Sequence, residues 1–173
     1  KEGQQLAQGC GAVADQINKL PKWGAKALKA LARTDRQDIS CSELAVGLAS
    51  LEHKFGSPRK LVRKLLERGL HRPTENALAQ AIWLEERANI ELDTTDLLET
   101  VPLANEAKAL RAYEDNRYSE AVIYATKWAN DQPFSARPYL WAGSCSSVYM
   151  SDYDLSASIY RQGLRVHPRH PML

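Results

Sequence analysis

The sequence of 173 residues has few cysteines, no cluster of glycines and no long hydrophobic run. Its three cysteines, Cys10, Cys41 and Cys145, are isolated, which favours reduced thiols over a disulfide framework. The nine glycines are scattered, so no phosphate-binding loop is predicted. Charged residues interrupt every apolar stretch before the roughly 18 residues that a membrane-spanning helix needs. We therefore expect a soluble, cytoplasmic protein that does not enter a membrane.

The patterns typical of β-strands are also missing. No alternating run of β-branched residues occurs, and no Asn-Gly or Asp-Gly pair joins two apolar segments. Apolar residues instead recur at helical spacing. Gly56 would end one helix in a left-handed conformation, and Ser57 and Thr74 would cap the next two. The predicted helices cover residues 5–20, 25–33, 42–55, 57–71, 75–90, 103–115, 118–130, 137–150 and 152–166, and residues 91–102 form a connector or a short helix.

Two hairpins near the end of the chain repeat one pattern at an offset of 35 residues, although few letters are shared. In both, an aromatic residue opens the second helix, a small residue follows three positions later, and a proline ends the segment. A fixed period of helix, turn and helix indicates units that stack and bury their faces against their neighbours. We assign to the repeat core Tyr118, Ala121, Ala125, Trp128 and Pro133 in the first copy and Tyr153, Ser156, Tyr160 and Pro168 in the second.

Residues 103–168 resemble the tetratricopeptide repeat, a helical hairpin with a period of 34 residues. The chain departs from that pattern at Ala125, where an aromatic is usual, and at Trp128 and Gly163, where alanine is usual. The resemblance implies an all-α fold of stacked antiparallel helical hairpins, a tetratricopeptide-like α-solenoid. An unrelated α-hairpin solenoid is the alternative. The small residues of the first helices are assigned to Ala109 and Ala112 in one copy and to Ser144 and Ser147 in the other.

Three regions are expected along the chain. Residues 1–56 hold N-terminal helices of uncertain repeat type, residues 57–102 hold a degenerate helical repeat and a connector, and residues 103–173 hold the two tetratricopeptide-like repeats. The first residue is lysine instead of methionine, so we expect the chain to be a segment of a longer protein.

Tetratricopeptide arrays line a concave groove with their first helices, and the resemblance implies a partner-binding surface there. Members of the family that grip a terminal carboxylate use lysine, arginine and asparagine at such places. Those residue types are absent from four of the positions concerned, so a carboxylate clamp is not predicted. The mixed apolar and aromatic set favours an apolar or aromatic-bearing peptide, or a helix of the same protein. The groove residues so predicted are Glu106, Leu110, Tyr113, Trp141, Cys145 and Tyr149.

Positive charge is concentrated in the first half of the chain. Residues 1–73 carry 14 lysines and arginines against 7 acidic residues, and residues 74–173 carry 9 against 14. Within the helix predicted over residues 57–71, the basic side chains lie opposite the apolar ones. This basic ridge would meet phosphates or an acidic partner, although many solvated helix faces share the pattern. The ridge consists of Arg59, Lys60, Arg63, Lys64 and Arg68.

No combination of side chains predicts catalysis, a cofactor or a metal site. His167 and His170 form a His-x-x-His pattern, but the prolines around them favour a solvated turn over a zinc site. Glu85 and Glu86 are adjacent on a helix and diverge. Of the tryptophans, Trp83 is expected between helices, like Trp23 and Trp128, whereas Trp141 is expected in the groove; a stacking platform for bases is the alternative.

These observations predict a noncatalytic helical-repeat scaffold that mediates protein–protein or interdomain interaction. Its partner would be a protein, a peptide or another domain of the same chain. The alternative is a nucleic-acid-associated helical-repeat domain that uses the basic first half.

Overall fold

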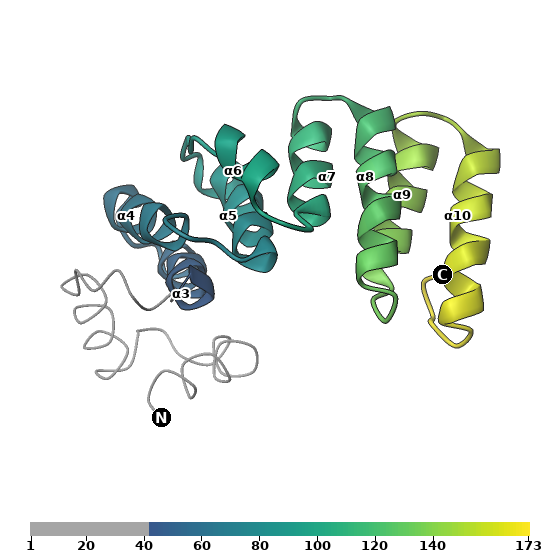
Figure 1. Ribbon diagram of the computed structural model, residues 1–173, viewed down its shortest axis with the longest axis horizontal. Helices are drawn as coiled ribbons and strands as arrows, with labels where there is room; N and C mark the ends of the chain where they lie inside the picture. The colour runs from purple at the N-terminus through teal and green to yellow at the C-terminus, as the bar shows by residue number, and fades with distance from the viewer. Residues whose placement is uncertain (1–41) are drawn as a thin grey trace. The chain divides into compact units, whose positions relative to one another are not determined.

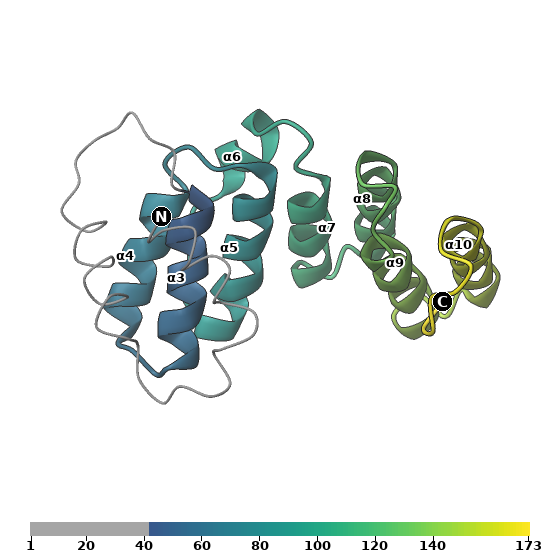
Figure 2. The same ribbon diagram turned by 90° about the horizontal axis from the view of Figure 1, so that it is seen from below.

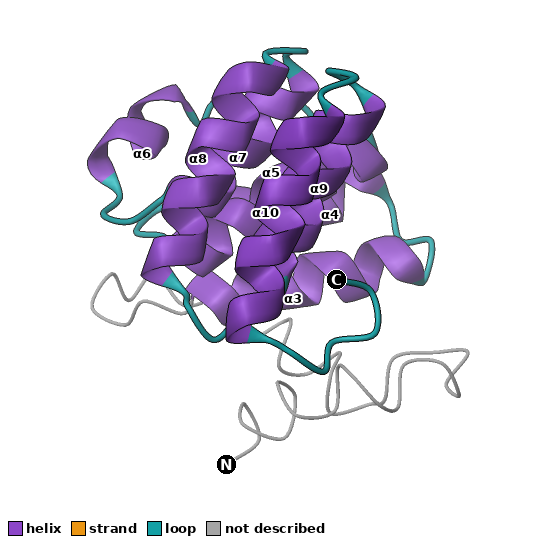
Figure 3. Ribbon diagram, turned by 90° about the vertical axis from the view of Figure 1, so that its right-hand side faces the viewer, coloured by secondary structure: helices purple, strands orange, loops and turns teal. Residues whose placement is uncertain are grey.

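The computed structural model describes residues 42–173, which divide into two compact units, residues 42–93 and residues 94–173 (Figure 1). All regular secondary structure in the described part is helical and no strand occurs there, as Figure 3 shows. The predicted all-α class is therefore confirmed. The predicted features that fall outside the described residues are the helices over 5–20 and 25–33, Cys10, Cys41 and Trp23.

The first unit consists of α3 (Ser42–Lys54), α4 (Arg59–Gly69) and α5 (Glu75–Ala88), and each of these helices packs against the other two. Its buried side chains come from the apolar face of each helix. Burial of these side chains supplies most of the driving force that holds the three helices together. The largest of them are Val46, Leu48, Val62, Leu66, Leu78, Ile82 and Leu84.

The ends of these helices agree in part with the sequence analysis. Thr74 caps α5, because its hydroxyl accepts a hydrogen bond from the backbone N–H of Ala77 at 3.1 Å. Gly56 follows α3 with φ 73°, the left-handed conformation that was expected. Ser57 does not cap α4, contrary to the prediction. Its hydroxyl donates instead to the carboxylate of Glu52, which is buried in α3 and needs a partner.

Trp83 corrects a second expectation. Its side chain is 42% exposed instead of packed between helices. The guanidinium carbon of Arg87, one turn further along α5, lies 3.9 Å from the centre of the Trp83 ring. A cation over an aromatic face is favourable even at an exposed site. Trp83 therefore lies on the exposed face of α5 and contributes little to the core of the first unit.

The second unit contains a short helix, α6 (Thr95–Thr100), followed by α7 (Asn105–Glu114), α8 (Tyr118–Asp131), α9 (Arg137–Val148) and α10 (Tyr153–Val166). Each of the four long helices packs on the next one along the chain (Figures 1 and 2). The short helix predicted within residues 91–102 is thus present as α6. The core shared by the four long helices is formed by Ala109, Val122, Ala125, Ala142, Cys145 and Ile159.

The two hairpins are related by different offsets in their first and second helices. Asn116 and Ser151, 35 residues apart, both adopt positive φ in the turn between the two helices of a hairpin. In the first helices, however, the buried small residue that corresponds to Ala109 is Gly143, 34 residues later. One extra residue therefore lies in the α9–α10 turn. A side-chain Cβ on Gly143 would lie 2.6 Å from the ring of Tyr160, so glycine permits this close helix contact.

This register corrects the assignment of small residues in the second copy. Ser144 is exposed and Ser147 is half-buried. The buried positions are instead Gly143 and Ser146, one residue earlier, and Gly143 faces Tyr160 of α10. The backbone carbonyl of Gly143 accepts a hydrogen bond of 2.8 Å from the hydroxyl of buried Ser156, which fixes α9 against α10.

The residues assigned to the repeat core differ in their burial. Tyr118 and Tyr160 are half-buried. Tyr153 is 70% exposed, so it does not belong to the core of the described residues. Both closing prolines are exposed, and they shape the chain after the helix without filling the core. The assigned core residues that are buried are Ala121, Ala125, Trp128 and Ser156.

Candidate functional site

Four aromatic side chains from α7, α8 and α9 meet in the second unit. We call Tyr113, Tyr118, Trp141 and Tyr149 the aromatic patch. The ring of Tyr113 contacts Trp141 edge-on at a centroid distance of 5.4 Å and Tyr149 at 5.2 Å. Tyr118 and Tyr149 are stacked, with centroids 4.8 Å apart and ring planes 20° apart. Tyr149 is nevertheless 46% exposed, so the patch reaches the surface.

The ends of three helices position these rings. Tyr113 lies in the last turn of α7 and Tyr118 opens α8, on either side of the left-handed residue Asn116. The side-chain oxygen of Asn116 accepts a hydrogen bond of 2.6 Å from the hydroxyl of Tyr118. Tyr149 is the residue that ends α9, and its N–H donates to the carbonyl of Cys145 at 3.0 Å. The turns of the hairpins therefore hold the rings together.

The hydroxyl oxygens of Tyr113 and Tyr149 share a hydrogen bond of 2.5 Å. This bond is the main reason why the pKa of Tyr113 is raised from 10.0 to about 12, with burial and the neighbouring Tyr149 charge as smaller causes. Tyr113 thus remains a neutral phenol throughout the physiological range. The patch offers a partner ring faces and hydroxyl groups without formal charge.

The predicted groove residues are only partly brought together. Tyr113, Trp141 and Tyr149 meet in the aromatic patch, and Leu110 is half-buried on α7. Cys145 is buried in the core shared by the four long helices, and this burial raises the pKa of its thiol. Cys145 therefore cannot touch a partner, which corrects its assignment to a groove.

The extra residue in the α9–α10 turn explains that error. An offset of 35 residues pairs Leu110 with Cys145, whereas the offset of 34 that holds for the first helices pairs it with exposed Ser144. Tyr118, which the sequence analysis assigned to the repeat core, is the member of the patch that was missed. Its place at the start of α8, five residues after Tyr113, was the available signal.

Glu106 forms an ion pair instead of standing free in a groove. Its carboxylate accepts a hydrogen bond of 2.8 Å from Arg137 at the start of α9. Burial raises the pKa of Glu106, and Arg137 partly opposes this rise. The Arg137 guanidinium also lies 5.3 Å from the centre of the buried Trp128 ring. These contacts tie α7 to α9.

A hollow of about 500 Å³ lies elsewhere in the second unit, along α8. Its walls are mostly apolar and include none of the predicted groove residues. The sequence analysis did not foresee it, because its residues come from α8, from the α9–α10 connection and from the first turn of α10. The lining consists of Ser119, Val122, Ile123, Thr126, Lys127, Met150 and Leu155.

The basic ridge lies on α4 in the first unit. Arg68 is half-buried, and the other four side chains are exposed. None of those four takes part in an ion pair with another residue of the part that the structure describes. The four side chains are Arg59, Lys60, Arg63 and Lys64.

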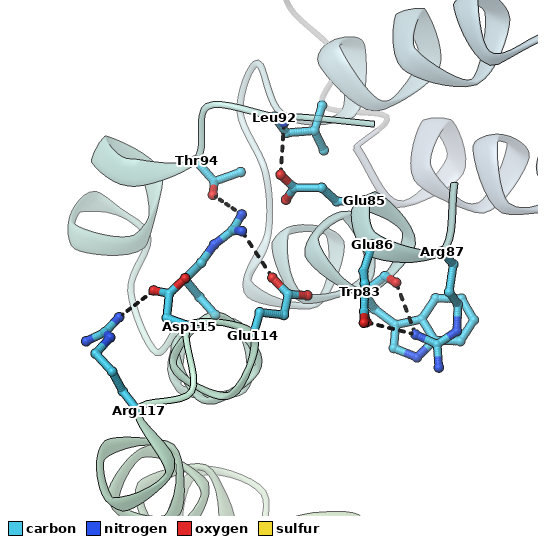
Figure 4. A network of polar contacts seen from close by, with 10 residues as sticks. Trp83, Glu85, Glu86, Arg87, Leu92, Thr94, Glu114, Asp115 and Arg117 are labelled. Carbon is cyan, nitrogen blue, oxygen red and sulfur yellow. Dashed lines mark hydrogen bonds and ion pairs between the residues drawn. The ribbon is translucent and has the colours of Figure 1, made fainter. Parts of the chain in front are cut away.

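The carboxylates considered in the sequence analysis have local partners (Figure 4). Buried Glu85 accepts a hydrogen bond of 2.9 Å from the backbone N–H of Leu92, and it thereby fixes the chain after α5. Glu86 lies 4.0 Å from Arg87. In the second unit, Arg111 binds the hydroxyl of Thr94 at 2.9 Å and the carboxylate of Glu114 at 3.0 Å.

His167 and His170 lie near one another after α10, with ring centroids 6.5 Å apart. The ring of His170 accepts a hydrogen bond from the N–H of Met172 at 3.3 Å. Among residues 42–173, no group of three or more His, Cys, Asp or Glu side chains is placed to hold a metal ion. Over the same range, none of the helices is both long enough and apolar enough to cross a bilayer.

No protein-family model matches this chain, and a search of curated proteins finds no match either.

Proposed function

We propose that the chain is a noncatalytic helical-repeat scaffold, related to the tetratricopeptide repeat, whose aromatic patch binds a protein or peptide partner. The observation that supports this most is the meeting of Tyr113, Tyr118, Trp141 and Tyr149 from three helices at an exposed place. The partner is a separate protein or another domain of the same chain.

The chemistry of the patch favours a particular kind of partner. Tyrosine and tryptophan are enriched among the residues that carry most of the binding energy at protein interfaces. Their rings are large and rigid, and their contact with one another leaves little side-chain entropy to lose on binding. Because Tyr113 and Tyr149 are uncharged, an apolar or aromatic side chain flanked by hydrogen-bonding groups suits the patch better than a charged one.

Peptides selected from a random display library against the whole chain test this proposal. We expect the selected peptides to contain aromatic or apolar anchors. The double substitution Trp141→Ala with Tyr149→Ala should weaken their binding by roughly 2 kcal/mol, about thirtyfold in Kd, because two ring anchors are lost. Titration calorimetry with the wild-type and substituted chains measures the difference.

Phe134 provides the matched control, because it is 94% exposed in the α8–α9 loop and contacts no ring of the patch. Phe134→Ala should leave the Kd unchanged. Tyr149→Ala alone leaves the half-buried Trp141 unchanged. Weaker binding by this single variant would therefore not result from misfolding caused by the loss of Trp141. Full-strength binding by both patch variants would refute the proposal.

The exposed ridge on α4 favours nucleic-acid binding as a second candidate function. Arg59 and Arg63 lie one turn apart, and neither forms an ion pair within residues 42–173. If these side chains contact phosphates, then Arg59→Glu with Arg63→Glu should abolish an RNA or DNA mobility shift that already weakens steeply between about 50 and 200 mM salt. If the ridge is only a solvated face, the chain shifts no probe at the lower salt concentration.

A further inference from the structure

The aromatic patch presents free hydrogen-bond donors as well as ring faces. The indole N–H of Trp141 bonds no other residue in the part that the structure describes, and its nitrogen is not buried. In the pair formed by Tyr113 and Tyr149, one hydroxyl donates to the other, so the accepting hydroxyl keeps its own proton free for a ligand. The hydroxyl proton of Tyr118 is already used, because it is donated to Asn116. The patch therefore offers a ligand two donors.

The charged side chains beside the patch in the α7–α8 turn are paired with one another. Arg117, next to Tyr118 in the chain, binds Asp115 and Glu120. No free charge in this turn therefore selects an acidic or a basic ligand. The electrostatic complement of the patch is a neutral ligand that offers acceptors and has few donors of its own. Such a ligand meets the free donors without leaving its own polar groups unsatisfied.

Backbone conformation decides which kind of peptide has these properties. In an α-helix the carbonyl groups accept hydrogen bonds from the helix itself, so a docked helix brings few acceptors to the patch. An added strand needs the edge of a sheet, and residues 42–173 contain no strand. A polyproline II segment has no internal hydrogen bonds, so its carbonyls are free, and its prolines carry no N–H donor. Its conformation is also preformed, which lowers the entropy lost on binding.

The size of the patch suits such a segment as well. The ring centres of Trp141 and Tyr149 lie 5.4 and 5.2 Å from the centre of the Tyr113 ring, so they are separated by at most the sum of these two distances. A polyproline II helix rises about 9 Å in one turn of three residues, which lies within that limit. Two prolines that are three residues apart face the same side of the segment. They can therefore contact Trp141 and Tyr149 together.

We propose that the aromatic patch binds a neutral, proline-rich peptide in the polyproline II conformation. Proline rings pack against the faces of Trp141 and Tyr149, as aromatic-lined surfaces allow. Peptide carbonyls accept hydrogen bonds from the Trp141 indole N–H and from the free hydroxyl of the Tyr113–Tyr149 pair. The peptide is a segment of another protein. This inference rests on the proposed function, because it names the partner of the same surface.

Decaproline with an acetylated start and an amidated end is the probe, because it is uncharged and adopts the polyproline II conformation. The whole chain, with its nitrogen atoms isotopically labelled, is titrated with this peptide while the indole N–H signals are followed by NMR. We expect the Trp141 indole signal to shift and to saturate. A capped peptide of the same length made of alternating glycine and serine is flexible, and it should cause no shift.

Trp141→Phe keeps an aromatic ring at the patch and removes the N–H donor. It should weaken decaproline binding roughly fivefold to tenfold in Kd, because one hydrogen bond to the peptide is lost. Trp83→Phe is the matched control, since Trp83 lies exposed on α5 outside the patch, and it should leave the Kd unchanged. Titration calorimetry measures each Kd, and circular dichroism should show the same helical content in both variants as in the wild-type chain.

The outcomes separate this inference from the proposed function. If decaproline does not bind, while peptides with aromatic or helical anchors bind at the patch, the proline-rich ligand is wrong and the scaffold function stands. If neither kind of peptide binds, both proposals are wrong. Equal affinity of the Trp141→Phe and wild-type chains, or binding of the glycine–serine peptide, would also overturn the inference. So would self-association that Trp141→Phe abolishes in sedimentation experiments, because the patch would then bind a second copy of the chain.

Discussion

At the scale of single residues, the hydroxyl groups of the aromatic patch are coupled. Tyr113 and Tyr149 come from different hairpins, and one hydroxyl group donates a hydrogen bond to the other across an O–O distance of 2.5 Å. Ionising Tyr113 would place a negative charge beside the Tyr149 oxygen in a partly buried place. The hydrogen bond therefore both orders the patch and resists its ionisation.

This coupling predicts how the stability of the patch depends on pH. The pKa of Tyr113 rises from 10.0 to about 12 in the folded protein, so folding favours the protonated phenol. The resulting stabilisation is complete below pH 10 and is lost as the pH rises towards 12. Tyr149→Phe removes the hydrogen bond, so it should lower the pKa of Tyr113. The protein should then lose less stability between pH 10 and pH 12. An NMR titration of ring-labelled Tyr113, together with urea unfolding at each pH, measures both effects.

Tyr153→Phe is the matched control, because Tyr153 is an exposed tyrosine outside the patch. That change should leave the Tyr113 titration where it is. An unchanged Tyr113 pKa in the Tyr149→Phe protein would show that burial, and not the hydrogen bond, sets the pKa.

At the scale of helices, close approach depends on particular small residues. In the first unit, Gly69 of α4 faces Val46 of α3, and an added Cβ would lie 2.5 Å from a Val46 methyl carbon. The same Cβ would lie 3.1 Å from the backbone carbonyl of Ser42, which cannot rotate away. Overpacking by Gly69→Ala should cost roughly 1–3 kcal/mol, against at most about 1 kcal/mol that alanine adds to helix stability, so we expect a net destabilisation of up to about 2 kcal/mol. Urea unfolding measures the net effect.

Gly47 is a matched control within the same unit, because it lies inside α3 and nothing stands within 4 Å of an added Cβ. Gly47→Ala should stabilise the protein by about 0.5–1 kcal/mol. The cost of Gly69→Ala should also shrink when Val46 is already alanine, since the clashing methyl is then absent. Equal costs in both backgrounds would contradict the overpacking explanation.

Within residues 42–173, the sequence was sufficient to predict the helices and the pairing of the last two hairpins. Periodicity and proline placed α7 to α10 to within a few residues, because these signals are local. It was not sufficient for the register of the first helices. One extra residue in the α9–α10 turn shifted the buried small residue from Ser144 to Gly143, and no local pattern marks that insertion.

The same one-residue shift explains why the candidate site was predicted only in part. Tyr113, Trp141 and Tyr149 were assigned to one surface, whereas Cys145 was placed there through the wrong offset. Burial of Tyr153 was expected by analogy with Tyr118. It depends on a covering helix, which α8 has and α10 does not have within residues 42–173.

At the scale of the whole molecule, the second unit contains the residues of its own core. Residues 94–173 include every member of the cluster that joins α7 to α10, and also the Thr94 hydroxyl that binds Arg111. We therefore expect these 80 residues to fold without residues 1–93. Circular dichroism should show a helical spectrum, and heating should give one cooperative transition.

The expected stability of this fragment is small enough for a single core substitution to unfold it. A single core of about 80 residues rarely supplies more than about 3–5 kcal/mol of net stability. Trp128 is the largest buried side chain of α8, and replacing a buried tryptophan by alanine costs about 3–5 kcal/mol. Trp128→Ala should therefore unfold the fragment outright, whereas Phe134→Ala, at an exposed loop position, should leave its melting temperature unchanged. A wild-type fragment with no helical signal would show that the second unit depends on the rest of the chain, and a folded Trp128→Ala fragment would show that burial of Trp128 is not needed for its stability.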